Sequence, residues 1–335
     1  MCSLKKITLA HGSGGTLMHD LIKGLFVKHL DNPFLNRLGD SALIDTRKKK
    51  IAYTTDSFVV NPIFFPGGDI GKLAVCGTVN DLAVCGAMPR YLSCGMIVEE
   101  GFDYSDLERI TLSIKAACRQ SGVNIVTGDF KVVEKGAADK IFINTSGVGE
   151  ILEKARLSIS RIRPGDKIIV SGPIGDHGAA VLLARGELKF RSRLLSDCAP
   201  LIGLISSIIC RDIKFMRDPT RGGLATTLNE ISLASGYNIS IDESRIPVRG
   251  PVMALCEILG LDPLYMANEG RVILIVSSGS ASRILSRMRR HALGRASRII
   301  GEVERRRAKR VYLKTMVGGA RILDMLMGEQ LPRIC

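Results

Sequence analysis

The chain has 335 residues, of which 46% are hydrophobic and 24% charged, and it carries a formal net charge of +14. No apolar run reaches the roughly 18 residues that a bilayer-spanning helix needs, and no signal-like apolar segment follows residues 1–6. We therefore expect a soluble cytoplasmic protein with two domains of ordinary size, and no membrane partner.

In the first half, strand-like and helix-like segments alternate. Residues 51–60 are rich in β-forming residues, and residues 69–87 place apolar side chains at helical spacing. The pattern then predicts a strand at 91–98, a helix at 104–120 that ends at Ser121-Gly122, and strands at 123–126 and 140–147.

The second half repeats this style, with strands predicted at 166–170, 239–241 and 272–276 and helices at 177–185, 197–209 and 223–235. After Gly318-Gly319 a short apolar helix is expected to end at Met327. Together the segments predict an α+β fold of two domains, each a mixed β-sheet with helices packed on one face. We expect an N-terminal domain at 1–155, a C-terminal domain at 156–310 and a mobile tail at 311–335.

The nine cysteines include no C-x-x-C pair. Cys76, Cys85 and Cys94 recur every nine residues, which matches no zinc-ligand spacing. Cys76 and Cys85 fall in an apolar stretch, where free cysteine packs like a small hydrophobic residue. We expect reduced thiols in a reducing compartment and no metal bound by these three.

Basic residues concentrate between 282 and 310 and include Arg289-Arg290 and Arg305-Arg306-Arg307. Such a segment is typical of a solvated helix face and loop, and it also suits an electrostatic surface for nucleic acid or an acidic partner. Only 5% of the residues are aromatic, and no zinc finger is present. A nucleic-acid-binding module is therefore a rival hypothesis of lower rank.

The chain ends in Pro332-Arg333-Ile334-Cys335, which puts a thiol on the terminal residue. Chain ends are usually exposed, so no packing argument requires a sulfur there. By position alone, chance explains it. The seven residues after Gly328 can nevertheless carry the sulfur on the order of 20 Å when extended.

Several aspartates lie beside glycines or at the edges of predicted elements: Asp40, Asp56, Asp81 and Asp129. Mg²⁺ prefers carboxylate oxygens shared with phosphates, so dispersed aspartates can converge on a nucleotide site. Taken singly, Asp40 and Asp56 suit turns or caps. A turn or cap role does not suit Asp81, because it falls inside a predicted apolar helix, where an unpaired buried charge is costly. A functional role is therefore favoured for this residue.

Three glycine-containing loops offer backbone N–H groups to phosphate, at 11–15, 66–69 and 218–223. The last precedes a predicted helix, which favours an anion site. Each loop is also compatible with an ordinary flexible turn. Lys131 and Glu269 complete the candidate set, Glu269 being either a general base or a solvated turn residue.

Together these motifs resemble the PurM-like (aminoimidazole ribonucleotide synthetase) superfamily of ATP-using enzymes, over nearly the whole chain. The matching segments are His11-Gly-Ser-Gly-Gly15, Thr54-Thr-Asp-Ser57, Phe65-Pro-Gly-Gly68, Gly77-Thr-Val-Asn-Asp-Leu-Ala83, Pro89-Arg-Tyr-Leu-Ser-Cys-Gly95, Gly128-Asp-Phe-Lys-Val-Val133, Ala267-Asn-Glu-Gly270 and the C-terminal Pro-Arg-Ile-Cys. The terminal cysteine is similar to that of one branch only, the carbamoyl dehydratases of hydrogenase maturation.

The resemblance implies ATP-dependent dehydration of an S-carbamoyl group on Cys335 to a thiocyanate, which provides the cyanide ligand of the nickel–iron hydrogenase iron. It implies HypF as carbamoyl donor, an iron-carrying HypC–HypD complex as cyanide acceptor, and a homodimer. ATP and Mg²⁺ are the implied cofactors, with an AIR synthetase-like ATP-binding domain at 1–155 and a second such domain at 156–310.

The resemblance also implies roles for residues. The catalytic residues are Cys335, which is also the modified residue, Glu269 and Lys131. The metal ligands are Asp40, Asp56 and Asp81. The implied ATP-binding residues are Asp40, Asp56, Asn80, Asp81, Gly128, Asp129, Asp218, Arg221, Gly222 and Gly223. Two positions depart from the family pattern, because Gly39 precedes Asp40 where a second acidic residue is common, and Phe130 replaces a common threonine.

The runner-up is another PurM-like synthetase or kinase, of the selenophosphate or thiamine monophosphate type, which would act on a soluble substrate without using the tail. Selenophosphate synthesis also expects a reactive cysteine, selenocysteine or substitute in the N-terminal glycine loop. His11-Gly12-Ser13 offers none.

Overall fold

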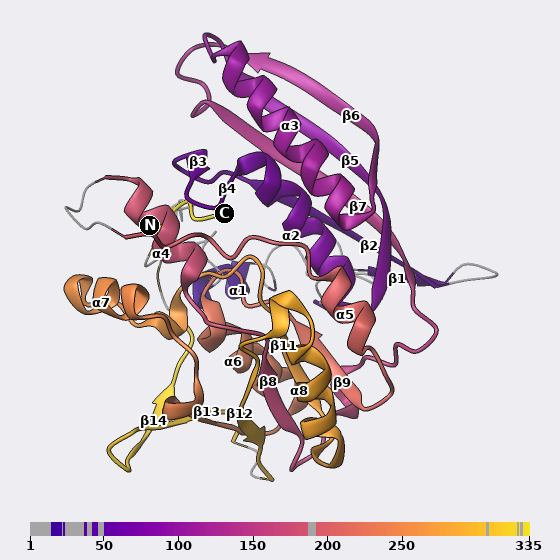
Figure 1. The fold of residues 1–335 in the computed structure, drawn as a ribbon, viewed down its shortest axis with the longest axis vertical. Helices are drawn as coiled ribbons and strands as arrows, with labels where there is room; N and C mark the ends of the chain where they lie inside the picture. The colour runs from indigo at the N-terminus through magenta and orange to yellow at the C-terminus, as the bar shows by residue number, and fades with distance from the viewer. Residues whose placement is uncertain are drawn as a thin grey trace, which may run out of the picture.

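The computed structural model describes residues 15–21, 23, 37–38, 42–45, 50–186, 192–305, 308–326, 328 and 331–335. Two large mixed β-sheets organise these residues, the first built mainly from the first half of the chain and the second from the second half (Figure 1). The short helix α1 (Thr16–Leu21) and the hairpin of β3 (Phe64–Phe65) and β4 (Gly68–Asp69) lie outside both.

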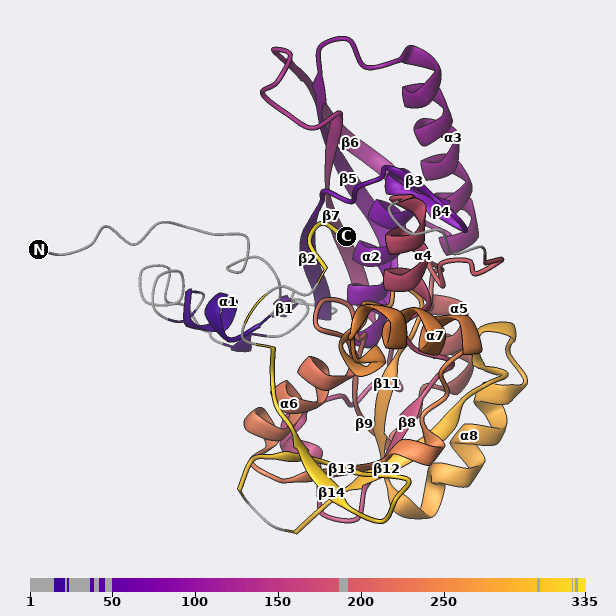
Figure 2. The same cartoon turned by 90° about the vertical axis from the view of Figure 1, so that its left-hand side faces the viewer.

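The first sheet has five strands in the order β1-β2-β7-β5-β6. Their bounds are β1 Ala42–Asp45, β2 Lys50–Phe58, β5 Ala87–Glu99, β6 Asn124–Val133 and β7 Ile141–Ile151. Only β5 and β6 run parallel. Helices α2 (Ile70–Val84) and α3 (Tyr104–Ser121) pack on one face of this sheet (Figure 2), as the sequence predicts.

Helix α2 is the central element of the first half. Nearly all of its side chains are buried, which explains why its sequence is apolar on every side rather than amphipathic. The Asp69 carboxylate caps the helix by accepting hydrogen bonds from the backbone N–H groups of Gly71 and Lys72. Gly77 allows the helix to approach β2, since a Cβ there would lie 2.8 Å from the ring of Phe58.

The second sheet has seven strands in the order β14-β13-β10-β12-β8-β11-β9. Their bounds are β8 Lys167–Val170, β9 Ile213–Arg217, β10 Ile239–Asp242, β11 Ile273–Val276, β12 Arg298–Val303, β13 Val311–Lys314 and β14 Ala320–Leu323. The helices of this half are α4 Asp176–Ala184, α5 Ile202–Ile208, α6 Gly223–Ser235, α7 Gly250–Leu259 and α8 Ala281–Arg289.

Helices lie on both faces of the second sheet. On β8, Ile168 and Val170 belong to a core shared with α6, whereas Ile169 belongs to the core that includes α5 and α8. The α+β fold with two mixed sheets is confirmed. The one-face arrangement expected for both halves describes the first sheet, and the second sheet differs because its alternate strand residues are apolar on both sides.

The short helix predicted to end at Met327 is wrong, because Ala320–Leu323 forms strand β14, paired antiparallel with β13. Gly318 adopts a positive φ of 86° and supplies the turn between the two strands. Since β13 also pairs with β10, the segment from 311 to 323 belongs to the second sheet. The tail, expected from residue 311, therefore begins only after Leu323.

The two halves share one continuous core. It joins α2, α3 and the first sheet to α5, α8 and one face of the second sheet. A backbone hydrogen bond of 2.8 Å from Ser196 to Pro66 links the halves outside this core. Gly67 has a φ of +95°, and a Cβ there would lie 2.8 Å from the Ser196 nitrogen, so this close approach requires glycine.

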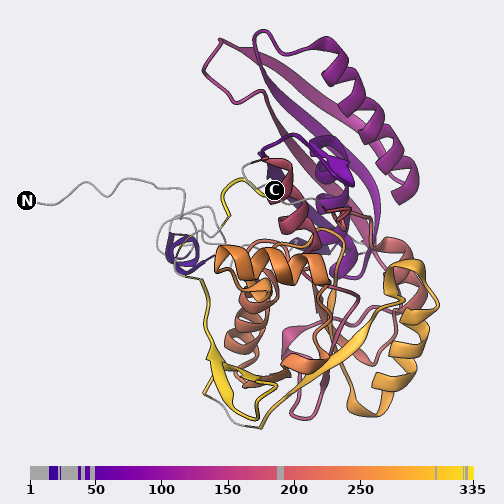
Figure 3. The same ribbon diagram turned by 60° about the vertical axis from the view of Figure 1, so that its left-hand side comes forward.

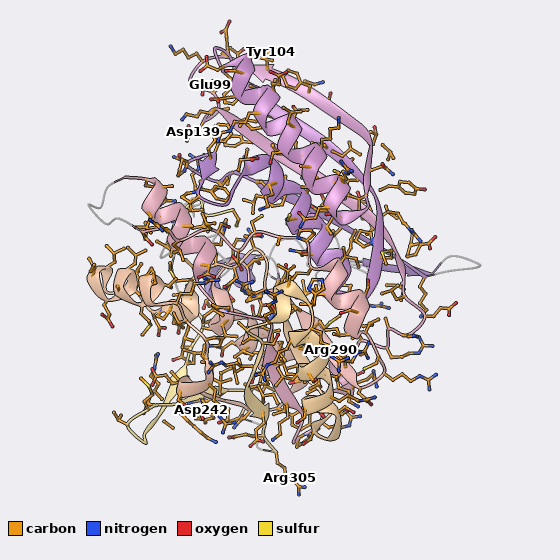
Figure 4. All side chains as sticks on the ribbon, viewed as in Figure 1. Glu99, Tyr104, Asp139, Asp242, Arg290 and Arg305 are labelled. Carbon is orange, nitrogen blue, oxygen red and sulfur yellow. The ribbon has the colours of Figure 1, made fainter. Side chains whose placement is uncertain are left out.

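The basic segment lies on the surface of the second half. Helix α8 buries Ala281, Ile284 and Met288 and leaves Arg289 exposed. Arg290 and Arg305 project outward (Figure 4). No helix in the described part of the chain combines the length and apolarity needed to span a bilayer.

Candidate active site at the C-terminal tail

The end of the tail is docked against the segment that follows β2 (Figures 2 and 3). The N–H of Val59 donates to a terminal carboxylate oxygen of Cys335 at 3.2 Å, and the N–H of Asn61 donates to the carbonyl of Arg333 at 3.0 Å. The Arg333 guanidinium returns a hydrogen bond to the Val59 carbonyl at 2.9 Å. The last residues therefore continue the hydrogen bonding of β2 in a strand-like manner.

Side chains of the tail anchor it on two sides. Ile334 is 5% exposed and belongs to the core, and Cys335 packs against the same core. Arg333 forms an ion pair with Asp139, and its guanidinium carbon lies 5.9 Å from the centre of the Phe142 ring. Asp139 is labelled in Figure 4. The terminal cysteine thus has a defined position in the described structure.

Two residues that sequence reasoning missed also hold the tail. Arg185, the residue that follows α4, donates to the carbonyl oxygens of Pro332 and Arg333 and, through Nε, to the carbonyl of Asn61 at 3.1 Å. Helix α4 supplies the second residue. His177 of the same helix lies 2.8 Å from the carbonyl of Ile334. The sequence contains no local signal for either contact, because the partners are more than 100 positions apart.

Glu269 is a buried carboxyl group, 3% exposed, on the loop before β11. Burial raises its pKa well above the ordinary value, and the negative charges of Asp218 and Asp197 raise it further. Asp56 acts in the same direction, while Arg221 opposes the shift. A carboxyl with a raised pKa can accept a proton near neutral pH, as a general base requires.

The loop carrying Glu269 is held by a buried ionic network. Asp197 accepts hydrogen bonds from the N–H groups of Glu269 and Gly270 at 3.1 and 3.2 Å. Arg271 lies 3.5 Å from Asp197 and 3.2 Å from Asp176. This pairing keeps the buried carboxylates compensated and fixes the backbone beside the candidate base.

Asn80, predicted to contact ATP, has its amide engaged elsewhere. The side chain is 1% exposed, and its Nδ2 donates to the carbonyls of Ala199 and Glu269 at 3.1 Å each. Its Oδ1 accepts from the N–H of Leu201 at 2.7 Å. Both amide hydrogens are used, so Asn80 positions the Glu269 loop against α2.

Asp56 and Asp81 come from different elements and face the same space. Thr54, two residues before Asp56 on β2, donates to Asp81 of α2 at 2.8 Å. A Cβ on Gly77, one turn before Asp81, would lie 3.9 Å from Oδ2 of Asp56. The strand and the helix therefore bring the two predicted metal ligands to their common interface.

Arg221 marks the point where the predicted residues converge. Arg221 is exposed as a whole residue, and Cys335 raises the pKa of its guanidinium most strongly, against the opposing effect of partial desolvation. The charges of Asp56, Glu269 and Asp81 raise it further. The tail terminus, both aspartates and the candidate base therefore act electrostatically on one guanidinium.

The loop that carries Arg221 opens α6. Gly222 and Gly223 have positive φ values of 72° and 60°, and a Cβ on Gly223 would lie 2.5 Å from the Met266 carbonyl. Asp218 is 7% exposed. The N–H of Gly223 donates within the loop to the carbonyl of Thr220 at 3.0 Å, and the anion site at the start of α6 stays a prediction.

Lys131 lies apart from this group in the single chain. It forms an exposed ion pair of 2.8 Å with Asp129 on the edge strand β6. Residue pairing places Lys131 beside Ile97 and Ile97 beside Phe142, so two strands separate β6 from β2. Packing alone explains a glycine at position 128, since a Cβ there would lie 2.4 Å from the Cys94 carbonyl oxygen.

Asp40 and the glycine loop at 11–14 lie outside the described residues. Within the described ranges no group of three or more His, Cys, Asp or Glu side chains is arranged to hold a metal ion. A pair such as Asp56 and Asp81 still fits Mg²⁺, which is commonly bound by one or two carboxylates together with substrate phosphates.

Both halves of the chain match models of one class of protein. Residues 38–151 match the N-terminal domain of AIR synthase related proteins, and residues 163–314 match the C-terminal domain. The chain therefore carries both domains of this class, and the resemblance to the PurM-like superfamily is confirmed.

Individual relatives narrow the assignment. The chain is 48% identical to the carbamoyl dehydratase HypE of Bradyrhizobium diazoefficiens, covering 98% of this chain and 96% of the relative. It is also similar to HypE in a crystal structure of a HypE–HypF complex, with 48% identity, a TM-score of 0.87 and coverage of 91% and 99%. A structure of HypE with ATP gives 50% identity, a TM-score of 0.82 and coverage of 98% and 100%. The chain belongs to the HypE family of carbamoyl dehydratases.

Proposed function

We propose that this carbamoyl dehydratase uses ATP to convert an S-carbamoyl group on its own Cys335 into a thiocyanate. The observation that carries the proposal is the docked tail. Cys335 acts electrostatically on Arg221, and so do Asp56, Asp81 and Glu269. The docked tail supports the proposal because it holds Cys335 within electrostatic range of the guanidinium that the candidate base and metal ligands also influence.

The chemistry balances in two steps. In the first, the carbamoyl oxygen attacks the γ-phosphorus of ATP, ADP leaves, and the nitrogen loses one proton. In the second, the C–O bond breaks, phosphate departs, and the nitrogen loses its other proton to give S–C≡N. Oxygen is a poor leaving group until it is phosphorylated, which is why ATP is required.

Glu269 is the residue proposed to accept the nitrogen protons. Its raised pKa and its buried position support this role, because a base surrounded by protein does not exchange its proton freely with water. Arg221, which remains cationic, is proposed to orient the phosphate and balance its charge. Asp218, Gly222 and Gly223 shape the loop that would hold the ATP phosphates at the start of α6.

Mg²⁺ is proposed to be held by Asp56 and Asp81, with Asp40 as a further ligand, and it would neutralise the phosphate charge. The Thr54 hydroxyl orients Asp81 toward this position. ATP binding itself is supported by the similar HypE that was crystallised with ATP.

We propose a homodimer formed through the open face of the first sheet. Tyr53 of β2 and Tyr91 and Ile97 of β5 are 43%, 53% and 45% exposed on this face, where only β7 separates the two strands. So many exposed large apolar side chains on one sheet face are unusual. Lys131 lies on the same face. In the proposed dimer it would contact the candidate active site of the second copy, which it does not reach in its own chain. Gly128 and Asp129 are proposed to contribute to ATP binding from the same edge strand.

The proposed reaction needs a carbamoyl donor and a cyanide acceptor. A HypE similar to this chain was crystallised with HypF, and we propose HypF as the carbamoyl donor to Cys335. The thiocyanate would pass its cyanide to iron in a HypC–HypD complex for a nickel–iron hydrogenase. The cytoplasm is the proposed compartment.

The test is mass spectrometry of the tail. Protein carbamoylated on Cys335 and then given ATP and Mg²⁺ should lose the mass of one water from the peptide that protease cleavage after Glu329 releases. Cys335→Ala should show no loss. ATP turnover on a soluble substrate without any change in the tail would instead favour a kinase or synthetase of the thiamine monophosphate or selenophosphate type.

A further inference from the structure

A fully buried histidine touches the tail one residue before the reactive cysteine. His177 is 0% exposed, and its ring packs edge-on against Phe65 at a centroid distance of 5.3 Å. Its Nε2 lies 2.8 Å from the Ile334 carbonyl, and its Nδ1 lies 2.8 Å from the Ser196 hydroxyl. Buried histidines of this kind need both ring nitrogens satisfied.

The two contacts determine which nitrogen carries the proton. The Ile334 carbonyl can only accept a hydrogen bond, so Nε2 must be the donor. Burial lowers the pKa of His177, which favours the neutral ring. In a neutral imidazole Nδ1 is then an acceptor, and the hydroxyl of Ser196 donates to it.

Ser196 is itself fixed in place. Its oxygen accepts a hydrogen bond from the N–H of Cys198 at 3.0 Å, and its own N–H donates to the carbonyl of Pro66 at 2.8 Å. The hydroxyl hydrogen is therefore directed to His177. A chain of hydrogen bonds runs from the backbone of Cys198 through Ser196 and His177 to the tail.

The docked tail must also be released. Cys335 is only partly exposed and packs against the core. On the proposed function it must reach a second protein to receive its carbamoyl group and then return. A single neutral hydrogen bond suits this cycle, because its loss shifts an equilibrium by about twofold to tenfold rather than locking one state.

We propose that His177, oriented by Ser196, is a positioning residue that latches the carrier tail in its docked pose. This inference rests on the proposed function. The contact is to the carbonyl of Ile334, one residue from the cysteine, so the latch acts through the backbone and not through the thiol. Arg185, Arg333 and the backbone N–H groups of Val59 and Asn61 provide further contacts and keep the register of the tail.

The experiment measures how often the tail is undocked. Full-length protein is treated with iodoacetamide, and alkylation of Cys335 is followed in the peptide released by cleavage after Glu329. His177→Phe keeps the ring volume but lacks the donor, and His177→Gln keeps an amide donor that can reach the position of Nε2. We expect alkylation to accelerate about twofold to tenfold in His177→Phe and to keep the parent's rate in His177→Gln.

Activity provides the second readout. With carbamoylated protein and saturating ATP, the rate of water loss in a single turnover should fall in His177→Phe and recover in His177→Gln, whereas the KM for ATP should not change. Equal alkylation rates in His177→Phe and the parent would overturn the latch, as would equal acceleration in both variants.

Folding is checked by thermal unfolding of each variant. If His177→Phe does not fold, His177→Asn takes its place, because its shorter amide reaches Ser196 but not Ile334. If the parent shows no water loss but alkylation responds as expected, the proposed function fails and the latch stands.

Discussion

At the scale of residues, the burial of Glu269 makes its ionisation costly and also makes its carboxylate more basic. A carboxyl group without solvent is costly to ionise, and its neighbours Asp218 and Asp197 add to that cost. The same surroundings give it the basicity that proton removal needs. Asp197 and Arg271 hold the loop that carries this costly carboxyl group.

Replacing Glu269 by Gln should separate these effects. The pKa of Glu269 is raised in the folded protein above the unfolded value of 4.5. Its contribution to stability is therefore fully present below that value and is lost as pH rises through the folded-state pKa. We expect Glu269→Gln to lower the rate of dehydration by about 10²- to 10⁴-fold and to be more stable than the parent at pH 7.

Urea unfolding of both proteins without ATP or metal, at several pH values, checks the stability change. The stability of the variant relative to the parent should grow as pH rises from about 4.5. A difference that does not vary with pH would contradict the raised pKa.

A second residue-scale prediction concerns Asp81. In Asp81→Asn the amide oxygen still accepts from the Thr54 hydroxyl, so the local structure should persist. The lost carboxylate charge should raise the apparent KM for Mg²⁺·ATP by more than about tenfold. Glu302→Gln, on β12 of the second sheet, serves as a matched control and should leave the KM unchanged.

At the scale of elements, the packing of α2 on β2 decides where the two aspartates lie. Neither element alone contains the site. The strand supplies Asp56 and Thr54, and the helix supplies Asp81 one turn after Gly77. The absence of a side chain at Gly77 allows the contact with Phe58 and so sets the spacing between the carboxylates.

Gly77→Ala tests this packing. The added methyl group would lie 2.8 Å from the Phe58 ring, so it must displace the ring or the helix. We expect destabilisation by about 1–3 kcal/mol, measured by urea unfolding, together with reduced ATP binding. Gly250→Ala is the matched control in a helix, since nothing lies within 4 Å of a Cβ there, and its stability should be unchanged or higher.

At the scale of the whole molecule, the first sheet has one face covered by helices and the other open. A sheet can leave one face to water when that face is polar. Here the open face carries Tyr53, Tyr91 and Ile97, which favours contact with another protein surface. The proposed homodimer would cover these side chains.

Ile97→Asp should weaken that dimer by placing a charge in its apolar centre. Analytical ultracentrifugation is expected to show a shift from dimer to monomer at micromolar concentration. Ile258→Asp, at an exposed position on α7, should keep the parent's association state. A parent protein that sediments as a monomer would refute the proposal directly.

The sequence by itself determined the class of protein and most of its elements. Local patterns are sufficient for this, because the apolar run of α2 and the glycine that ends α3 act over a few residues. The same local reading failed at Ala320–Leu323, where pairing with β13 overrides a weak helical pattern. The terminal cysteine and the aspartate motifs were also readable, since they are chemical signals that do not depend on packing.

Only the tertiary structure decided how these residues work together. His177 and Ile334 are separated by 157 positions, and Asn80 and Glu269 by 189, so no local pattern predicts either contact. Asn80 became a positioning residue because both of its amide hydrogens are used by backbone carbonyls. The role of Lys131 in the site stays a prediction, since two strands separate β6 from β2 in the single chain. Long-range packing, which depends on the whole fold, determines which chemically able residues actually meet.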